Sequence, residues 1–131
     1  MLELKLILEG ENFHDIDTFY EEINRLVMED EDWELGSSLD AFNDLLYGGY
    51  GILQGYEELK IIWLNSEKSR GDLGLETTLA YYNQKLKLPN IFNKELIQKK
   101  INELESGNGL TYFEILLEII SEHKNVRLDL R

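Results

Sequence analysis

Two aspartates, Asp40 and Asp44, are the side chains of this sequence whose type and spacing best suit chemistry or binding. They lie within GSSLDAFNDLLYGG (36–49), where a polar start, apolar residues at helical spacing and a glycine stop predict a helix over 38–47. Side chains four residues apart share one helix face, where two carboxylates repel each other. No lysine or arginine stands near them in the sequence. We therefore interpret the pair as a binding feature for a partner.

Paired carboxylates can also act as general acid and base, but that role requires burial that drives their two pKa values apart. A pair on an exposed helix in a negative field lacks this asymmetry. His14 and His123 have no partner at metal-ligand or triad spacing, and we expect both to be exposed at helix ends. We expect no metal, no other cofactor and no enzymatic activity. A small hydrolase that uses the carboxylates is the third functional class to be tested.

The formal net charge of −13 is large for 131 residues, and it is unevenly distributed. Residues 1–58 hold sixteen acids and two bases, whereas residues 59–102 hold four acids and eight bases. A negative field of this size repels nucleic acid and anionic lipid, and it speeds encounter with basic proteins. The charge therefore disfavours direct nucleic-acid or membrane binding and favours a basic protein partner, although an acidic surface can also serve solubility alone.

The elements that must position the aspartates follow from hydrophobic periodicity. Leucines alternate with other residues over 2–9, the run 59–64 is apolar enough for a strand buried on both faces, and 126–130 alternates again. Helices are expected over about 15–28, 38–47, 65–70, 76–87, 93–105 and 111–124. Because helices separate the strands, we expect right-handed crossovers and a parallel sheet, which predicts an α/β protein.

Length and composition predict a single domain over 1–131 that folds without disulfides, because the chain has no cysteine. The first nine residues are too short and too charged for a signal peptide. No segment approaches the roughly 18 apolar residues of a membrane span. We therefore expect a cytoplasmic protein.

The segment 36–48 also follows the pattern Gly-x-x-Leu-Asp-Ala-x-x-Asp-x-Leu-x-Gly. This pattern resembles the inhibitory helix of the barstar family, the intracellular inhibitors of the secreted bacterial ribonuclease barnase. The resemblance extends to Ile61-Ile62-Trp63 with Glu67 and Ser69, and to residues 110–131. With the opening strand and helix, it covers about two-thirds of the chain.

The resemblance implies a barstar-like fold: a three-stranded parallel sheet in the order 2-1-3, flanked by helices. It implies that Asp40 and Asp44 enter a ribonuclease active site and that Glu118, on the last helix, faces the same enzyme. The residues around the helix would form the rim of this partner-binding surface. They are Ser38, Asn43, Tyr47, Gly48 and Tyr50. Asn43 stands where the family often has a tryptophan.

The chain departs from the family by an insertion at about 72–108, before the last helix, which contains five of the thirteen lysine and arginine residues. We expect it to form two extra helices away from the inhibitory face. The leading hypothesis is a ribonuclease inhibitor or immunity protein, a monomer without cofactor, that blocks a basic barnase-like ribonuclease. The alternative is an acidic interaction domain of the same fold that binds a different basic protein or toxin.

Overall fold

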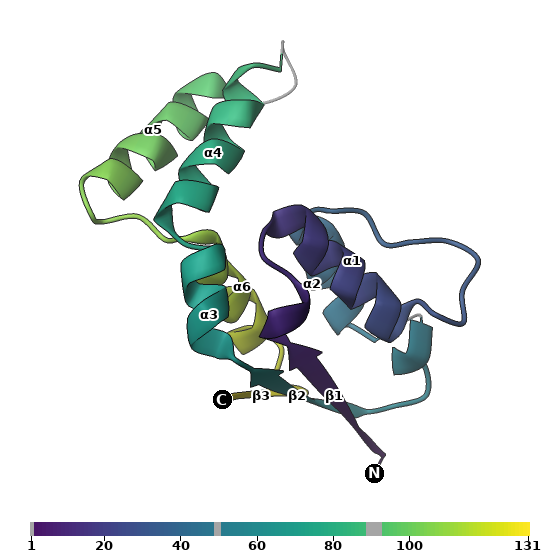
Figure 1. Ribbon diagram of the computed structural model, residues 1–131. Coiled ribbons are helices and arrows are strands. Elements are labelled where there is room, and N and C mark those ends of the chain that lie inside the picture. The colour runs from purple at the N-terminus through teal and green to yellow at the C-terminus, as the bar shows by residue number, and fades with distance from the viewer. Residues whose placement is uncertain (1, 49–50, 89–92) are drawn as a thin grey trace.

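The computed structural model describes residues 2–48, 51–88 and 93–131, which form an α/β fold with a parallel three-stranded sheet (Figure 1). The strands are β1 (Glu3–Glu9), β2 (Glu58–Leu64) and β3 (Val126–Leu130). The helices are α1 (Ile16–Val27), α2 (Leu39–Leu46), α3 (Ser66–Asp72), α4 (Leu75–Leu86), α5 (Lys94–Glu105) and α6 (Tyr112–Ser121). Short 3-10 helices lie at Gly10–Asn12 and Gly51–Leu53.

The strand order is β1-β2-β3, so the predicted order 2-1-3 was wrong. The central strand is β2, whose Leu59 pairs with Leu4 of β1 and with Val126 of β3. A central strand is paired along both edges, and the apolar run of β2 suits that position. In the outer strands, apolar residues alternate with charged ones, and charged side chains protect an exposed sheet edge from pairing with another chain.

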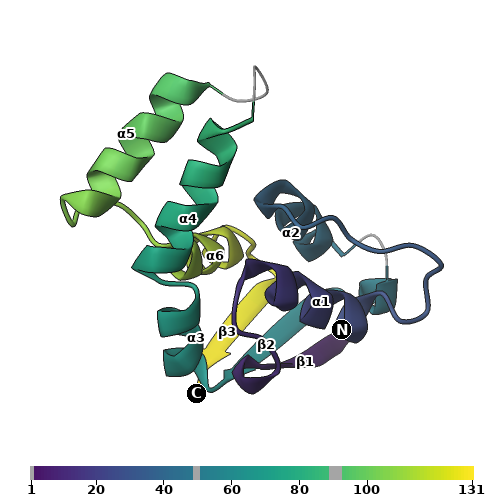
Figure 2. The same ribbon diagram turned by 45° about the horizontal axis from the view of Figure 1, so that its top comes forward.

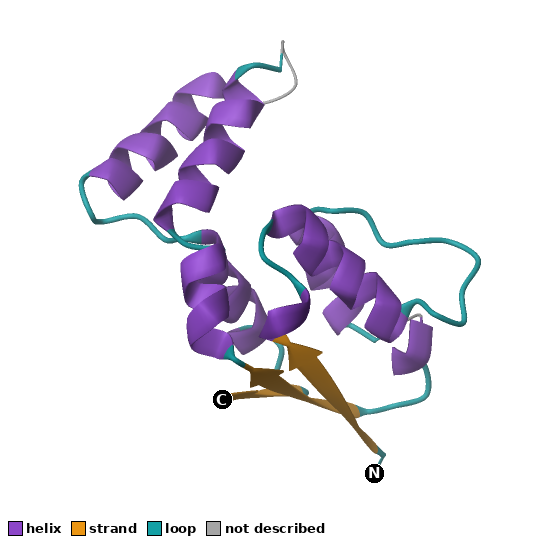
Figure 3. Ribbon diagram, in the orientation of Figure 1, coloured by secondary structure: helices purple, strands orange, loops and turns teal. Residues whose placement is uncertain are grey.

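The helices gather over one face of the sheet (Figure 3), and β2 is fully buried on that face only. Leu59, Ile61 and Trp63 are buried, whereas the alternate residues of β2 are half-buried, so the expectation of burial on both faces was wrong. On the uncovered face, Lys5, Lys60 and Arg127 are aligned across the three strands. Arg127 also forms an ion pair with Glu3 of β1.

The core between helices and sheet is built around Trp63, which has no exposed surface. The rings of Phe13, Phe19 and Phe113 surround its indole with centroids 5.1–6.3 Å away. The indole Nε1 donates a hydrogen bond to Ser69 Oγ at 3.0 Å, which satisfies the only polar atom of this side chain. These contacts fix α1, α3 and α6 on the sheet.

The buried carboxylate of Glu22 in α1 has two partners. Arg25 donates to its two oxygens at 2.7 and 2.8 Å, and Asn12 Nδ2 donates at 2.9 Å. The pKa of Glu22 is lowered mainly by the hydrogen bonds that it accepts from Arg25. The ionised form of this carboxylate is thus favoured by folding.

Replacing Glu22 by glutamine is expected to flatten the acid dependence of stability. Because the folded state lowers its pKa, ionised Glu22 contributes stability above the usual glutamate pKa of about 4.3. This contribution is lost as the pH falls through the lower folded value. In urea denaturation, the free energy of unfolding of the wild type should fall more steeply between about pH 5 and pH 3 than that of Glu22→Gln. Equal slopes would contradict the prediction.

The segment 72–108 contains the two helices that the sequence predicted there, and α4 and α5 pack against each other as a hairpin. It has a small core of its own, made of Tyr82, Ile97, Ile101 and Leu104. At its base, Thr78 Oγ1 donates to Gly74 O at 2.6 Å and accepts the backbone N–H of Tyr112 at 2.7 Å. Figure 2 shows the hairpin rising from the region where α4 meets α6.

Candidate functional site

The helix α2 carries both aspartates and is anchored on the core by one face. Ser38 is its N-cap, because its Oγ accepts the backbone N–H of Ala41 at 3.1 Å. Phe42, Leu45 and Leu46 are buried. Gly48 follows the helix with φ +81°, a conformation that glycine adopts without strain. Ser38 and Gly48, both predicted for the partner surface, therefore have local structural roles.

Asp40 and Asp44 lie on the exposed face of α2, as predicted from their spacing. Within 2–48, 51–88 and 93–131, neither carboxylate forms an ion pair with a lysine, arginine or histidine. Asp40 lines a cleft together with Lys85 of α4, whose ammonium lies 4.4 Å from the centre of the Tyr81 ring. The two carboxylates are thus presented to solvent from a rigid element.

Asn43 and His123 were both placed wrongly as solvent-facing side chains. His123 is only 6% exposed, and its Nε2 lies 2.7 Å from Oδ1 of Asn43, which is half-buried. The ring of Tyr47 meets the imidazole edge-on at a centroid distance of 4.7 Å, while Tyr47 itself stays 73% exposed. The contact joins α2 to the residue that follows the C-cap of α6. Asn43 therefore helps to position the acidic helix.

Replacing Asn43 by alanine is expected to lower the free energy of unfolding by about 1–3 kcal/mol, because a buried imidazole nitrogen loses its hydrogen-bond partner. Urea denaturation followed by circular dichroism measures this change. Asn108→Ala is the matched control, since the Asn108 amide is exposed and bonded only locally to Ser106 among the described residues. Equal stability of the two variants would show that the Asn43–His123 contact contributes nothing.

Glu118 is exposed on α6 and lines one cleft with Leu39, the first residue of α2. The two other glutamates on the same face of α6 lie at the ends of the helix. Glu114 completes the N-terminal capping box with Thr111, and Glu122 is the C-cap residue. The structure therefore brings Glu118 near the start of the aspartate helix. Tyr50, also predicted for the rim, lies outside the described residues.

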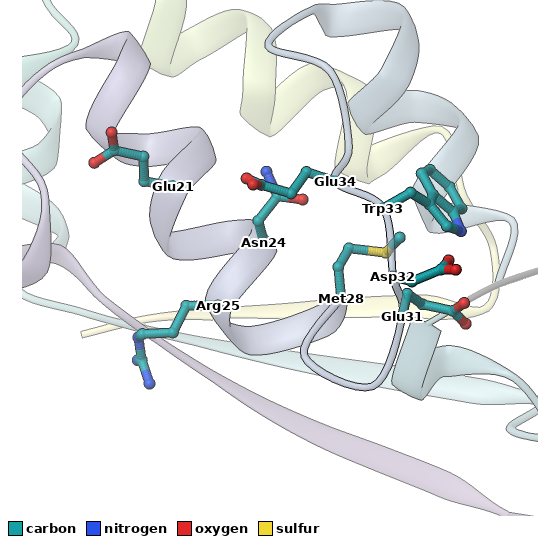
Figure 4. A pocket seen from close by; sticks show the side chains of 8 residues that line it. All are labelled: Glu21, Asn24, Arg25, Met28, Glu31, Asp32, Trp33 and Glu34. Carbon is teal, nitrogen blue, oxygen red and sulfur yellow. The ribbon is translucent and has the colours of Figure 1, made fainter.

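A second acidic surface, not singled out from the sequence, lies between α1 and the loop before α2 (Figure 4). It is a cleft of about 400 Å3. Its lining residues are Glu21, Asn24, Arg25, Met28, Glu31, Asp32, Trp33 and Glu34. Asn24 fixes the loop by bonding Leu35 N at 2.6 Å and Leu35 O at 3.1 Å. The run of acidic residues was visible in the sequence and could have indicated this surface. The burial of Leu35, which folds the acidic loop back, could not be predicted from the sequence.

The described residues contain no group of three or more His, Asp or Glu side chains arranged to hold a metal ion. None of the helices in this part of the chain combines the length and apolar character that crossing a membrane requires. Asp40, Asp44 and Glu118 present exposed carboxylates on α2 and α6. Such a surface can accept charge-assisted hydrogen bonds from arginine and lysine of another protein.

Comparisons with models of protein families, with curated proteins and with solved structures found no match for this chain. The resemblance to the barstar family thus depends on the motif at 36–48 and on the succession of strands and helices along the chain, because the strand order in the sheet differs from the one it implied.

Proposed function

We propose that this protein inhibits a basic ribonuclease by placing Asp40, Asp44 and Glu118 in the enzyme's active site. The observation that carries the proposal is the exposure of Asp40 and Asp44 on an anchored helix, with no ion-pair partner among the described residues. In the active site of a ribonuclease, arginine and lysine bind the phosphates of RNA. Carboxylates held at suitable spacing can take the place of these phosphates.

The rigidity of the acidic helix supports tight binding. The buried face of α2 and the Asn43–His123 contact hold the aspartates before the partner arrives. Binding then requires little ordering of the inhibitor, so less of the interaction energy is lost. The negative field of the first 58 residues would accelerate encounter with a positively charged enzyme.

The second candidate, an acidic interaction domain for a different basic protein or toxin, is favoured by the cleft around Trp33. There, four carboxylates line the same cleft as a tryptophan that is 46% exposed. An aromatic face beside carboxylates suits a lysine or arginine side chain. This cleft lies outside the motif that resembles the barstar family.

The proposal is tested by incubating the purified chain with a panel of secreted basic ribonucleases of the barnase type and measuring RNA cleavage. Stoichiometric loss of cleavage by at least one enzyme is expected, and its association rate should fall as salt rises. Binding of a basic protein without loss of its nuclease activity would favour the second candidate. Uninhibited cleavage by every enzyme of the panel would count against ribonuclease inhibition.

A further inference from the structure

A groove of about 400 Å3 lies between the α4–α5 hairpin and the helix that carries Glu118. Residues of α4, of α5, of the loop before α6 and of α6 itself line it, and Leu39, the first residue of α2, lines it as well. The hairpin therefore does not stand away from the acidic helix, as we had expected. A protein that contacts both Asp40 and Glu118 must lie beside this groove.

The groove has an apolar lining that exists before any partner binds. Its aliphatic members come from four segments of the chain: Leu39, Leu104, Leu110 and Ile115. Leu104 belongs to the core of the hairpin, whereas Leu110, in the loop before α6, is 43% exposed. Thr78 Oγ1 of α4 accepts the backbone N–H of Tyr112 at 2.7 Å, which fixes α4 on the start of α6. An exposed leucine beside a preformed hollow can bury more surface when a partner docks.

The groove also contains a hydrogen-bond donor that the fold does not use. Tyr82 of α4 lines the groove and is only 8% exposed, yet its hydroxyl forms no hydrogen bond with any of the described residues. Every fully buried side-chain nitrogen or oxygen among these residues has a partner, so the unbonded hydroxyl must reach the surface. Burial is the main cause that raises the pKa of Tyr82, and Tyr81 and Glu103 contribute, so the hydroxyl keeps its proton. Such a donor is satisfied by water in the free protein and can be satisfied by an acceptor of a bound partner.

Carboxylates outnumber cations around the groove. Glu103 of α5 and Glu118 of α6 line it together with Lys100, and none of the three forms an ion pair with another of the described residues. Lys100 is exposed, so its long stem can carry the ammonium group into solvent. The excess of carboxylates continues the negative charge that Asp40 and Asp44 present on α2. The groove is therefore complementary in charge to the same basic surface as the aspartates.

We propose that this groove receives one bulky apolar side chain of the target ribonuclease, from a loop that carries a lysine or arginine beside it. The apolar side chain would pack against Leu104, Leu110 and Ile115. A backbone carbonyl of the loop would accept the Tyr82 hydroxyl, and the basic neighbour would meet Glu118. Anchor side chains that fill a pocket of the partner often supply much of the binding energy. This inference rests on the proposed function and adds which enzymes of that class are bound: those with such a loop beside the active site.

The test uses the full chain and the barnase-type ribonuclease of the panel that it inhibits. Tyr82→Phe removes the unused hydroxyl and keeps the ring that fills the hairpin core. Leu110→Ala removes the exposed leucine of the groove, which belongs to neither hydrophobic core of the described residues. Leu96→Ala is the matched control, because Leu96 is a 52% exposed leucine of the hairpin that does not line the groove. All three variants keep the net charge, so their long-range attraction for a basic enzyme is equal.

Surface plasmon resonance should show dissociation faster by about threefold or more for Tyr82→Phe and about fivefold or more for Leu110→Ala, with Leu96→Ala near the wild type. Alanine scanning of the apolar residues around the enzyme's active site should find one whose loss is not additive with Leu110→Ala, which identifies the anchor.

Groove variants that dissociate no faster than Leu96→Ala would overturn the anchor, while weaker binding by Asp44→Ala would still uphold the proposed function. Dimerisation of the free chain that Leu110→Ala abolishes, measured by size-exclusion chromatography, would assign the groove to a second copy and also overturn the anchor. Failure of the wild type to bind any enzyme would overturn both proposals.

Discussion

Replacing Asp44 by alanine is expected to weaken binding of the target ribonuclease by about 2–5 kcal/mol, which is roughly 30-fold to several thousand-fold in Kd. That range draws in part on barnase–barstar complexes themselves, the family that the motif resembles. The reason is that truncation leaves arginine or lysine of the enzyme buried and unpaired. Most of the loss should appear in the dissociation rate, measured by surface plasmon resonance.

The same substitution should leave the fold intact, because Asp44 is exposed and bonds nothing through its side chain among the described residues. Removal of one carboxylate from the pair even relieves repulsion of about 0.2–0.5 kcal/mol. Glu11→Ala is a suitable control, since it removes an exposed acid that does not belong to the acidic helix α2. If both variants bound as tightly as the wild type, the acidic helix would not be the inhibitory element.

Replacing Trp63 by alanine is expected to lower the free energy of unfolding by about 3–5 kcal/mol. The indole contacts three aromatic rings and donates to Ser69, so its loss leaves a cavity and a buried hydroxyl with an unused acceptor. With a typical total stability of only 5–15 kcal/mol, this is a large fraction. Urea denaturation followed by circular dichroism measures it.

Trp33→Ala provides the matched comparison, because the second tryptophan of the chain is 46% exposed at the edge of an open cleft. We expect a change below about 1 kcal/mol for this surface position. Equal losses of unfolding free energy in the two variants would mean that the aromatic cluster around Trp63 does not stabilise the core.

Local chemistry predicted much of the secondary structure. Thr111 followed three residues later by Glu114 is the spacing of a capping box, and both of its hydrogen bonds are present. Asp15 caps α1, and the glycine stop after α2 was foreseen at Gly48. These features depend on residues within one helical turn of each other, which is why periodicity and composition suffice.

Long-range contacts were the part that the sequence did not reveal. The order of the strands depends on which edges pair, and nothing in β1 or β3 alone excludes the order 2-1-3. The buried imidazole of His123 forms a hydrogen bond with Asn43, which lies eighty positions earlier in the chain. The side on which the hairpin stands depends on Thr78 and Tyr112, two residues that carry no such signal. For the candidate site, the aspartates were predictable and their surroundings were not.

The uncovered face of the sheet also affects how the molecule behaves when it is concentrated. Lys5, Lys60 and Arg127 stand side by side across the strands, so a second sheet laid on this face in register would bring like charges together. Sheets without such charges can stack and grow into fibrils. A second copy laid on this face would have to remove these charged side chains from water, which opposes the stacking of two sheets face to face.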